Sequence, residues 1–446
     1  MSKRILGARR DTIFAPASGV GRSAIAVVRI SGPDCERALQ ALAPGATFPD
    51  RVATLRTLFD SETREPLDRA LVVRFVAPRS FTGEDMAELH VTGGRAVVAG
   101  VMAALGKAPG LRPADPGEFA WRAFENGKLD LAEVEGLADL VDAETAAQRR
   151  QALRIAGGAL SRQADALRAL LVRAMAVLES QIDFSDVEDA ENLSLQDARR
   201  LAADARDRIG EILASARSGE RLREGLSVVI AGPPNVGKST LMNALSKREV
   251  SIVSASPGTT RDLIEVSLDL EGYPVTLIDT AGIRDSDDPI EREGVERARR
   301  RAADADLTLW LTESEFPIDR RASASSIWVV TKQDQAPQVI RTGDDIPLRI
   351  SAKTGEGLGE LIGAITRFAA TQFAGASSAL ITTERHRIAF TDAQSALARA
   401  LDPNLEAVEL VAEDLRLAAR ALERIAGRID VEDVLGDIFS RLCVGK

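Results

Sequence analysis

The sequence predicts a multidomain protein with α/β and all-α parts: an N-terminal α+β domain, followed by a discontinuous helical domain into which an α/β domain is inserted. Three observations indicate this architecture. Strand-like and short helical patterns alternate in the first part of the 446-residue chain, helical spacing then dominates two separate blocks, and strands alternate with helices between those blocks. With 45% hydrophobic and 28% charged residues, the composition is that of an ordinary globular protein.

The N-terminal domain is expected to span residues 1–118. Its first clear strand is the apolar run over residues 23–32, which ends at a glycine. The further elements that we expect are a helix over 34–43, strands near 52–59, 70–76 and 88–91, and a helix over 95–105 that Gly106 closes. Strands mixed with short helices are typical of a compact α+β domain.

Helical spacing predicts a helical domain in two parts, residues 119–218 and 373–446. Apolar residues recur every three or four positions from Leu153 to Ile182, which predicts one long amphipathic helix that Gly157 and Gly158 weaken locally. A second helix is expected from 194 to about 218, and the spacing returns over 384–446. We infer a helical bundle interrupted by another domain. Two separate helical domains are the alternative.

The inserted domain is expected over residues 219–372. Five apolar stretches predict its strands, at 226–232, 274–279, 307–311, 326–330 and 347–351, with helical segments between them. This alternation predicts a doubly wound sheet.

Charge and cysteine content exclude several classes of protein. The net charge of −10 opposes a phosphate-binding surface spread over the whole chain, although a local basic patch remains possible. The two cysteines, Cys35 and Cys443, lack the spacing of a metal site and fit a reducing cytosol. Neither a long apolar run nor a signal-like apolar segment after the first basic residues is present, so we expect a cytoplasmic protein without a membrane anchor.

Residues 232–240 read Gly-Pro-Pro-Asn-Val-Gly-Lys-Ser-Thr, which is a P-loop motif between a strand and a helical pattern. In such a loop backbone N–H groups surround phosphates, Lys238 reaches the outer phosphates and Ser239 can ligate Mg²⁺. The expected nucleotide-binding residues of this segment are Asn235, Val236, Gly237, Lys238, Ser239 and Thr240.

Two further motifs predict that the nucleotide is GTP. Thr331-Lys332-Gln333-Asp334 follows an apolar strand, and the Asp334 carboxylate can accept two hydrogen bonds from guanine nitrogens, which adenine cannot offer. Ser351-Ala352-Lys353 follows the next strand and is similar to the loop that supports guanine. Each motif alone is weak evidence for GTP, but the two motifs in this order after a P-loop are strong evidence.

A third motif, Asp279-Thr280-Ala281-Gly282, closes the strand before it. Asp279 can hold the Mg²⁺ shell, and the Gly282 N–H can approach the γ-phosphate, so Gly282 joins Lys238 as a candidate catalytic residue. Ras-like GTPases place a water-orienting glutamine next, whereas this chain has Ile283. Hydrolysis therefore needs help from elsewhere.

The inserted domain thus resembles the Ras-like P-loop G domain of Era- and MnmE-type GTPases. Segments outside it resemble the MnmE (TrmE) family of tRNA modification GTPases over essentially the whole chain. These segments are Arg29-Ile-Ser-Gly32, Ser80-Phe-Thr-Gly-Glu84-Asp85, Pro116-Gly-Glu-Phe119, Asn126-Gly-Lys128-Leu-Asp-Leu131 and Leu442-Cys-Val-Gly-Lys446. The alternative is an Era- or Der-like RNA-binding or ribosome-assembly factor, but the chain has one P-loop and no basic C-terminal module.

The resemblance implies an enzyme that adds an aminomethyl or carboxymethylaminomethyl group to carbon 5 of the wobble uridine of certain tRNAs. It implies a homodimer formed through a folate-binding N-terminal domain, and a heterotetramer with the FAD-dependent partner MnmG (GidA). A folate such as 5-formyltetrahydrofolate supplies the one-carbon unit. The matching folate-binding residues are Arg29, Glu84, Lys128 and Lys446.

The resemblance also implies K⁺ near the phosphates, held by Asn235, Ser254, Ser256 and Thr259. We also expect Ser254, Thr259, Thr280 and Ala281 to bind GTP. Thr260 matches the threonine that completes Mg²⁺ coordination with Ser239. Glu291 matches the catalytic glutamate that supplies what Ile283 cannot.

Three positions depart from the family pattern. Thr331 stands where an asparagine usually braces the P-loop, so we expect somewhat weaker nucleotide binding without a change of base. Pro257 fixes φ within the potassium loop. The tail has Leu442 where phenylalanine is usual, and its Cys443 invites the hypothesis of a nucleophile, against the simpler role of a small apolar side chain.

Overall fold

The computed structural model describes residues 11–19, 21–183, 195–233, 235–247, 251–252, 265–279, 305–313, 325–335, 348–376, 378–405, 407–429, 438–439, 442 and 445. The chain divides into two compact units. The first unit comprises residues 1–138, 156–165 and 423–446, and the second comprises 139–155 and 166–422. We describe each unit by itself.

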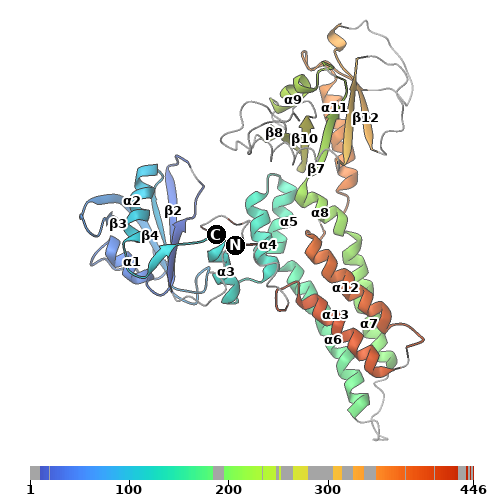
Figure 1. The fold of residues 1–446 in the computed structure, drawn as a ribbon, viewed down its shortest axis with the longest axis horizontal. Coiled ribbons are helices and arrows are strands. Elements are labelled where there is room, and N and C mark those ends of the chain that lie inside the picture. The colour runs from blue at the N-terminus through green and yellow to red at the C-terminus, as the bar shows by residue number, and fades with distance from the viewer. Residues whose placement is uncertain are drawn as a thin grey trace, which may run out of the picture. The chain divides into compact units, whose positions relative to one another are not determined.

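A six-stranded sheet forms the centre of the first unit, in the order β3-β4-β5-β2-β1-β6 (Figure 1). The strands are β1 (Thr12–Pro16), β2 (Ile25–Ser31), β3 (Thr54–Phe59), β4 (Pro66–Phe75), β5 (Met86–Thr92) and β6 (Leu111–Pro113). All neighbours are antiparallel except β1 and β6. The alternation of β2 places Ala26, Val28 and Ile30 in one buried core with residues of α1 (Cys35–Leu42) and α2 (Arg95–Gly106). These elements confirm the expected α+β pattern.

The opposite face of β1 is covered by α3 (Glu118–Glu125), whose Phe119 packs with Ile13 and Ala15. The C-terminal segment belongs to the same unit. Phe439 is fully buried, and its ring meets Trp121 edge-on at 5.1 Å, in a cluster that includes Leu131 at the start of α4 (Leu131–Asp142). Residues from the two ends of the chain therefore build one core.

A seven-stranded sheet organises the inserted part of the second unit, in the order β13-β12-β11-β7-β10-β9-β8. The strands are β7 (Leu226–Ala231), β8 (Ser251–Ile252), β9 (Glu265–Leu270), β10 (Tyr273–Asp279), β11 (Leu307–Thr312), β12 (Ser326–Val330) and β13 (Leu348–Arg349). The five strands from β13 to β10 are parallel, and β9 and β8 continue the sheet antiparallel. This is the doubly wound, Ras-like sheet that the sequence predicts, with α9 (Lys238–Ser246) and α11 (Leu358–Gln372) packed into its core.

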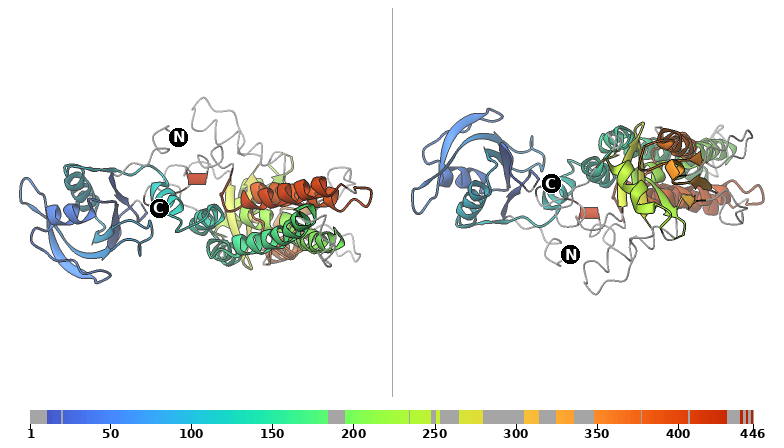
Figure 2. Two further views of the ribbon diagram at one scale, coloured as in Figure 1. Left: turned by 90° about the horizontal axis from the view of Figure 1, so that it is seen from below. Right: turned by 90° about the horizontal axis from the view of Figure 1, so that it is seen from above.

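Helices precede and follow this sheet in the chain: α5 (Ala146–Ala156), α6 (Ala159–Asp183), α7 (Leu195–Ala214), α8 (Ala216–Glu224), α12 (Glu384–Ala400) and α13 (Val408–Glu423). In Figures 1 and 2 the red C-terminal helices lie alongside the green helices of the first block. A helical domain interrupted by an α/β domain is therefore confirmed. No described helix is both long enough and apolar enough to cross a bilayer.

Two of the predicted helices are wrong in extent. The helix expected over 153–182 is two helices, because Gly158 adopts a left-handed φ of +76° and a Cβ there would lie 2.7 Å from Oε1 of Glu133. Likewise, the helix expected over 194–218 ends at Ala214, and α8 begins at Ala216. Apolar spacing continues through both breaks, so periodicity alone could not reveal them.

Candidate functional site

The loop between β7 and α9 has a backbone that its sequence enforces. Gly232 has φ +144°, and a Cβ there would lie 2.5 Å from the carbonyl oxygen of Leu311 on the neighbouring strand β11. Gly237, which precedes α9, has φ +103°. Asn235 also adopts a positive φ, of 63°. These conformations place the loop at the N-terminal end of α9, where helix N–H groups favour a phosphate.

Two side chains at the start of α9 have the polar contacts expected of a nucleotide site. The ammonium group of Lys238 is buried and donates to the carbonyl oxygens of Gly232 and Pro233, at 2.8 and 3.0 Å. The Ser239 hydroxyl donates to Oδ2 of the buried Asp279 at 2.9 Å. Asp279 ends β10 beside β7, and Ser239 lies in the first turn of α9, which follows the loop after β7, so the two side chains meet at one edge of the sheet. Hydroxyl and carboxylate oxygens fit Mg²⁺, which prefers oxygen ligands.

The two guanine-recognition motifs also meet. The buried Ser351 hydroxyl donates to Oδ1 of Asp334 at 2.8 Å, and the Thr354 amide donates to Ser351 Oγ at 3.2 Å. Asp334 is thus held with one oxygen tied to the loop after β13. The neighbouring Lys332 has φ +57°, and its ammonium group pairs with Glu313 at 2.6 Å.

Thr331 contacts the P-loop although it lacks the amide of the usual asparagine. Its buried hydroxyl donates to the Val236 carbonyl oxygen of the P-loop at 2.7 Å, and its amide donates to the Thr312 carbonyl at 2.8 Å. A brace to the P-loop is therefore present without the usual asparagine. The physical reason is reach, since a short hydroxyl suffices where the two backbones approach closely.

The described residues include about half of the predicted nucleotide and metal site. Of the remaining members, Thr240 and Lys353 are exposed, and Ala352 packs against the core of the sheet. Eight predicted members of the site lie outside the described residues: Ser254, Ser256, Thr259, Thr260, Thr280, Ala281, Gly282 and Glu291. Pro257, Ile283 and Cys443 also lie outside them.

Three of the four predicted folate-binding residues gather around the loop of residues 80–84 in the first unit, and Lys446 lies outside the described residues. The Arg29 guanidinium lies over the Phe81 ring at 5.3 Å. Lys128 approaches Gly83, whose Cβ, if present, would lie 3.2 Å from its Cγ. Glu84 ends the loop. Arg29 on β2, Glu84 just before β5 and Lys128 after α3 therefore lie close together although they are far apart in the sequence.

Each of the two cations already has polar partners. Arg29 donates to Glu88 Oε1 at 2.8 Å and to the Gly445 carbonyl oxygen at 3.1 Å. The Lys128 ammonium donates to the Pro78 carbonyl oxygen at 3.0 Å. Gly445 itself packs on the backbone at Pro16 and lies beside Arg29. The carbonyl partners are neutral and weaker than a carboxylate would be.

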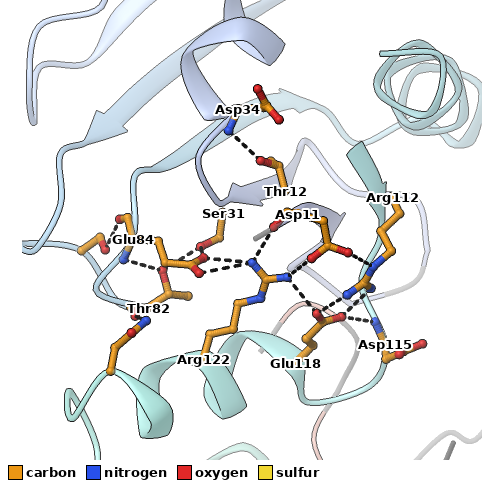
Figure 3. A network of polar contacts seen from close by, with 12 residues as sticks. Asp11, Thr12, Ser31, Asp34, Thr82, Glu84, Arg112, Asp115, Glu118 and Arg122 are labelled. Atoms are coloured by element: carbon orange, nitrogen blue, oxygen red, sulfur yellow. Dashed lines mark hydrogen bonds and ion pairs between the residues drawn. The ribbon is translucent and has the colours of Figure 1, made fainter. Parts of the chain in front are cut away.

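Glu84 belongs to a network of charged side chains, of which Arg122 and Glu118 are buried and Asp11 and Arg112 are partly exposed (Figure 3). Arg122 Nη1 donates to both Glu84 oxygens, at 3.3 and 3.1 Å, and the Ser31 hydroxyl donates to Glu84 Oε2 at 2.7 Å. Arg122 also binds Asp11 Oδ1 at 2.9 Å and Glu118 Oε1 at 3.0 Å. All of these partners come from β1, β2, α3 or the segments beside them.

Arg112 binds the same two carboxylates from the far side, with contacts of 2.7 Å to Asp11 and 2.5 Å to Glu118. Burial raises the pKa of Glu118, but hydrogen bonds from Arg112, the Asp115 amide and Arg122 outweigh it, and the pKa is lowered. Burial acts in the same way on Asp11, and the two arginines again lower its pKa. Both carboxyl groups are therefore ionised near neutral pH.

Sequence reasoning missed this network as a unit, although it quoted Glu118 within a family segment. One signal was available. Glu118 and Arg122 stand four residues apart on a helix, which is the spacing of an ion pair on one face. Nothing in the spacing indicated that both side chains would be buried.

The strand–loop–helix of residues 226–246, the Ser239–Asp279 pair and the Asp334 loop define a P-loop GTPase. A family model described as "MnmE helical domain" matches residues 131–443, and one described as "GTP-binding protein TrmE N-terminus" matches residues 12–128. The chain therefore belongs to the MnmE family of tRNA modification GTPases.

Relatives match along their full length. A protein of Beijerinckia indica named "tRNA modification GTPase MnmE" is 54% identical over 442 residues, covering 98% of this chain and 96% of its own. A protein of the same name from Methylobacterium sp. is 52% identical over 440 residues, covering 98% of this chain and 100% of its own. Among solved structures, the G domain of the FeoB iron transporter of T. maritima is 29% identical and covers 32% of this chain and 98% of its own, with a TM-score of 0.23, which is too low to support an argument.

Proposed function

We propose that this protein uses GTP hydrolysis to drive the addition of an aminomethyl or carboxymethylaminomethyl group at carbon 5 of the wobble uridine of certain tRNAs. The observation that carries the proposal is the presence, in one chain of this family, of a guanine nucleotide site and a separate polar site around residues 80–84. An Era- or Der-like factor has no need for the second site.

At the nucleotide site, Lys238 would leave its loop carbonyls and bind the outer phosphates, which are stronger, charged acceptors. Ser239 with Thr260 would hold Mg²⁺, and Asp279 would orient that shell. Asp334 would read the guanine edge while Ser351 holds it in place. Bound Mg²⁺ supplies electrostatic stabilisation of the charge that develops on the phosphates.

Hydrolysis requires a positive charge beside the β- and γ-phosphates and a group that orients water. We assign the first to K⁺ held by Asn235, Ser254, Ser256 and Thr259, and the second to Glu291. Asn235, with its positive φ, stands in the middle of the P-loop, where its side-chain oxygen can reach an ion beside the phosphates. The Gly282 N–H would contact the γ-phosphate.

At the N-terminal site we propose a one-carbon folate such as 5-formyltetrahydrofolate. Arg29, Lys128 and Lys446 would bind the glutamate carboxylates of that folate, and Glu84 would accept N–H groups of its pterin ring. The neutral carbonyl partner of Lys128 supports this assignment, because exchange for a carboxylate strengthens the hydrogen bond. Arg29 would keep its ion pair with Glu88 and would exchange only its contact with the Gly445 carbonyl.

We further propose that two copies associate through the outer face of the six-stranded sheet. One row across this face runs from Leu55 through Leu71 and His90 to Val27, in register on four strands. Leu55 and Leu71 are 46% and 37% exposed, and nearby Ile25 is 60% exposed. Neighbouring exposed apolar side chains favour a partner surface. The homodimer would act in the cytoplasm with the FAD-dependent MnmG (GidA), as a heterotetramer on tRNA.

The test is mass spectrometry of wobble nucleosides from cells that lack this protein and are complemented with variants. Wild type should restore the modified uridine, and Lys238→Ala should not, because it removes the phosphate ligand. Lys247→Ala is the matched control, since Lys247 is exposed at the other end of α9. Wobble uridines that do not change when the protein is lost would refute the proposal.

A further inference from the structure

We propose that Arg122 is a positioning residue of the folate site, which holds the Glu84 carboxylate in the orientation in which Oε1 receives an N–H donor of a pterin ring. The inference rests on the proposed folate function and adds a residue to it. Arg122 lies on α3 behind Glu84, so it acts through Glu84 rather than on the ligand (Figure 3).

Glu84 has little rotational freedom. Arg122 Nη1 contacts both of its oxygens, at 3.3 and 3.1 Å, while the Ser31 hydroxyl binds Oε2 at 2.7 Å. The Glu84 amide in turn donates to Thr82 Oγ1 at 3.2 Å. Side chain and backbone are therefore both anchored, which fixes the plane of the carboxylate. A carboxylate that is fixed in this way directs its remaining acceptor site toward an N–H group of the ligand.

Arg122 can act as a fixed support because it is itself immobilised. It is only 5% exposed, and its guanidinium donates to the Asp11 carbonyl at 2.9 Å, Asp11 Oδ1 at 2.9 Å and Glu118 Oε1 at 3.0 Å. Charge-assisted hydrogen bonds of a planar guanidinium define its orientation. The position of Glu84 is thus set by the core of the unit.

The balance of charge leaves Glu84 able to bind a ligand. Two guanidinium groups, of Arg112 and Arg122, face three carboxylates, of Asp11, Glu84 and Glu118. Asp11 and Glu118 each bind both arginines, whereas Glu84 binds Arg122 alone. Its Oε1 accepts one long hydrogen bond of 3.3 Å among the described residues, so acceptor capacity remains. A neutral ring N–H group fits this acceptor.

The test is a double-mutant cycle on the full-length protein, with 5-formyltetrahydrofolate affinity measured by calorimetry. Glu84→Gln and Arg122→Met should each weaken binding about tenfold or more, the range of a lost charge-assisted hydrogen bond. If Arg122 acts through Glu84, the double variant should be no weaker than the weaker single variant. Additive effects of the two substitutions would overturn the inference.

Arg112→Met is the matched control, because the described hydrogen bonds of Arg112 go to Asp11, Glu118 and the Pro113 carbonyl. It should lower the melting temperature but leave folate affinity within about twofold of wild type. Equal loss of affinity in Arg112→Met and Arg122→Met would show a general structural effect and overturn the inference.

Arg122→Lys covers the case in which the methionine variant does not fold, because lysine keeps the charge but loses the fork. Arg122→Lys should weaken the binding of 5-formyltetrahydrofolate but not the binding of p-aminobenzoylglutamate, which lacks the pterin ring. Equal weakening of the binding of both compounds would contradict the inference. Absence of folate binding by wild type would overturn the folate proposal and this inference together. If the wild type binds folate and the effects of the two substitutions on folate affinity are additive, only the role of Arg122 is overturned.

Discussion

The Thr331 hydroxyl donates a 2.7 Å hydrogen bond to the carbonyl oxygen of Val236 and so connects the guanine-recognition loop to the P-loop. Two loops that we predict to bind opposite ends of one nucleotide are thereby joined inside the protein. The connection uses a buried hydroxyl, which makes it sensitive to the loss of one oxygen atom.

Thr331→Val should therefore weaken GTP binding by roughly tenfold, since it leaves a buried carbonyl unsatisfied at a cost of about 1–3 kcal/mol. Thr331→Ser keeps the hydroxyl and should bind like wild type. Titration with a fluorescent GTP analogue measures both. Thr371→Val is the control, because the Thr371 hydroxyl lies exposed on α11. Wild-type affinity in Thr331→Val would show that the brace has no role.

Hydrolysis of GTP should be faster in KCl than in NaCl at equal ionic strength. The larger ion suits a site lined by several oxygens and should help to order the loop that carries Ser254 and Thr259, pair two G domains and position Glu291. Asn235→Ala should remove the difference between the salts, and Glu291→Ala should slow hydrolysis without weakening GTP binding. Phosphate release in each salt is the measurement. Equal wild-type rates would rule out the potassium mechanism, with Pro257 the first residue to test.

Arg29→Ala should lower the affinity for 5-formyltetrahydrofolate and leave GTP affinity unchanged, because the two sites lie in different units. The reason is the loss of a cation that now contacts Glu88 and the Gly445 carbonyl. Calorimetry with each ligand measures the effect. Arg69→Ala, at an exposed position on β4, is the control. A folate affinity that Arg29→Ala leaves intact would remove Arg29 from the site.

Leu71→Asp should dissociate the homodimer, since it places a charge next to the exposed Leu55 on the outer face of the sheet. Sedimentation velocity at several concentrations measures the association state. Leu153→Asp, at a leucine that is 51% exposed on α5, introduces the same charge elsewhere. A Leu71→Asp variant that sediments as a dimer would locate the interface on another face.

The first unit should lose stability as the pH falls below about 4. The pKa values of Asp11 and Glu118 are lowered in the folded state. Their contribution to the free energy of unfolding is therefore complete at pH values above their ordinary pKa values, and it disappears as the pH falls through the pKa values of the folded state. Trp121 fluorescence, in a Trp310→Phe and Trp328→Phe background, follows this unit alone. Arg112→Met should move the acid midpoint to higher pH, because it removes the hydrogen bonds that lower both pKa values. An unmoved midpoint would contradict this account.

Much of the architecture could be predicted because it depends on local patterns. Strand alternation correctly predicted four strands of the first sheet and five of the second, whereas β1, β6, β8 and β9 were missed. The motifs assigned Ser239 and Asp279 to one predicted Mg²⁺ site and Asp334 and Ser351 to one predicted guanine site, and each pair is joined by a hydrogen bond in the structure. The helix breaks were harder to predict, because the apolar spacing continues through Gly158 and the break shows only in the left-handed φ of that residue.

The polar interior could not be predicted for a related reason. Arg122 carries a charge, and charged side chains on a helix usually face water. Its burial depends on carboxylates from residues 11 and 84, which are distant in sequence. The brace from Thr331 likewise depends on how closely two backbones approach, which no residue pattern records.

The hydrogen bond from Arg29 to the Gly445 carbonyl joins residues that are 416 positions apart. A ribosome adds about 5–20 residues per second, so roughly 20 to 80 seconds pass between the synthesis of the two partners. During that interval the first sheet can form, while Trp121 still lacks Phe439. A nascent chain that stops before residue 438 can thus contain every element of the nucleotide-binding sheet and still have an unfinished first unit. Arg29 of the N-terminal site is therefore synthesised early, and its partner Gly445 is synthesised long after it.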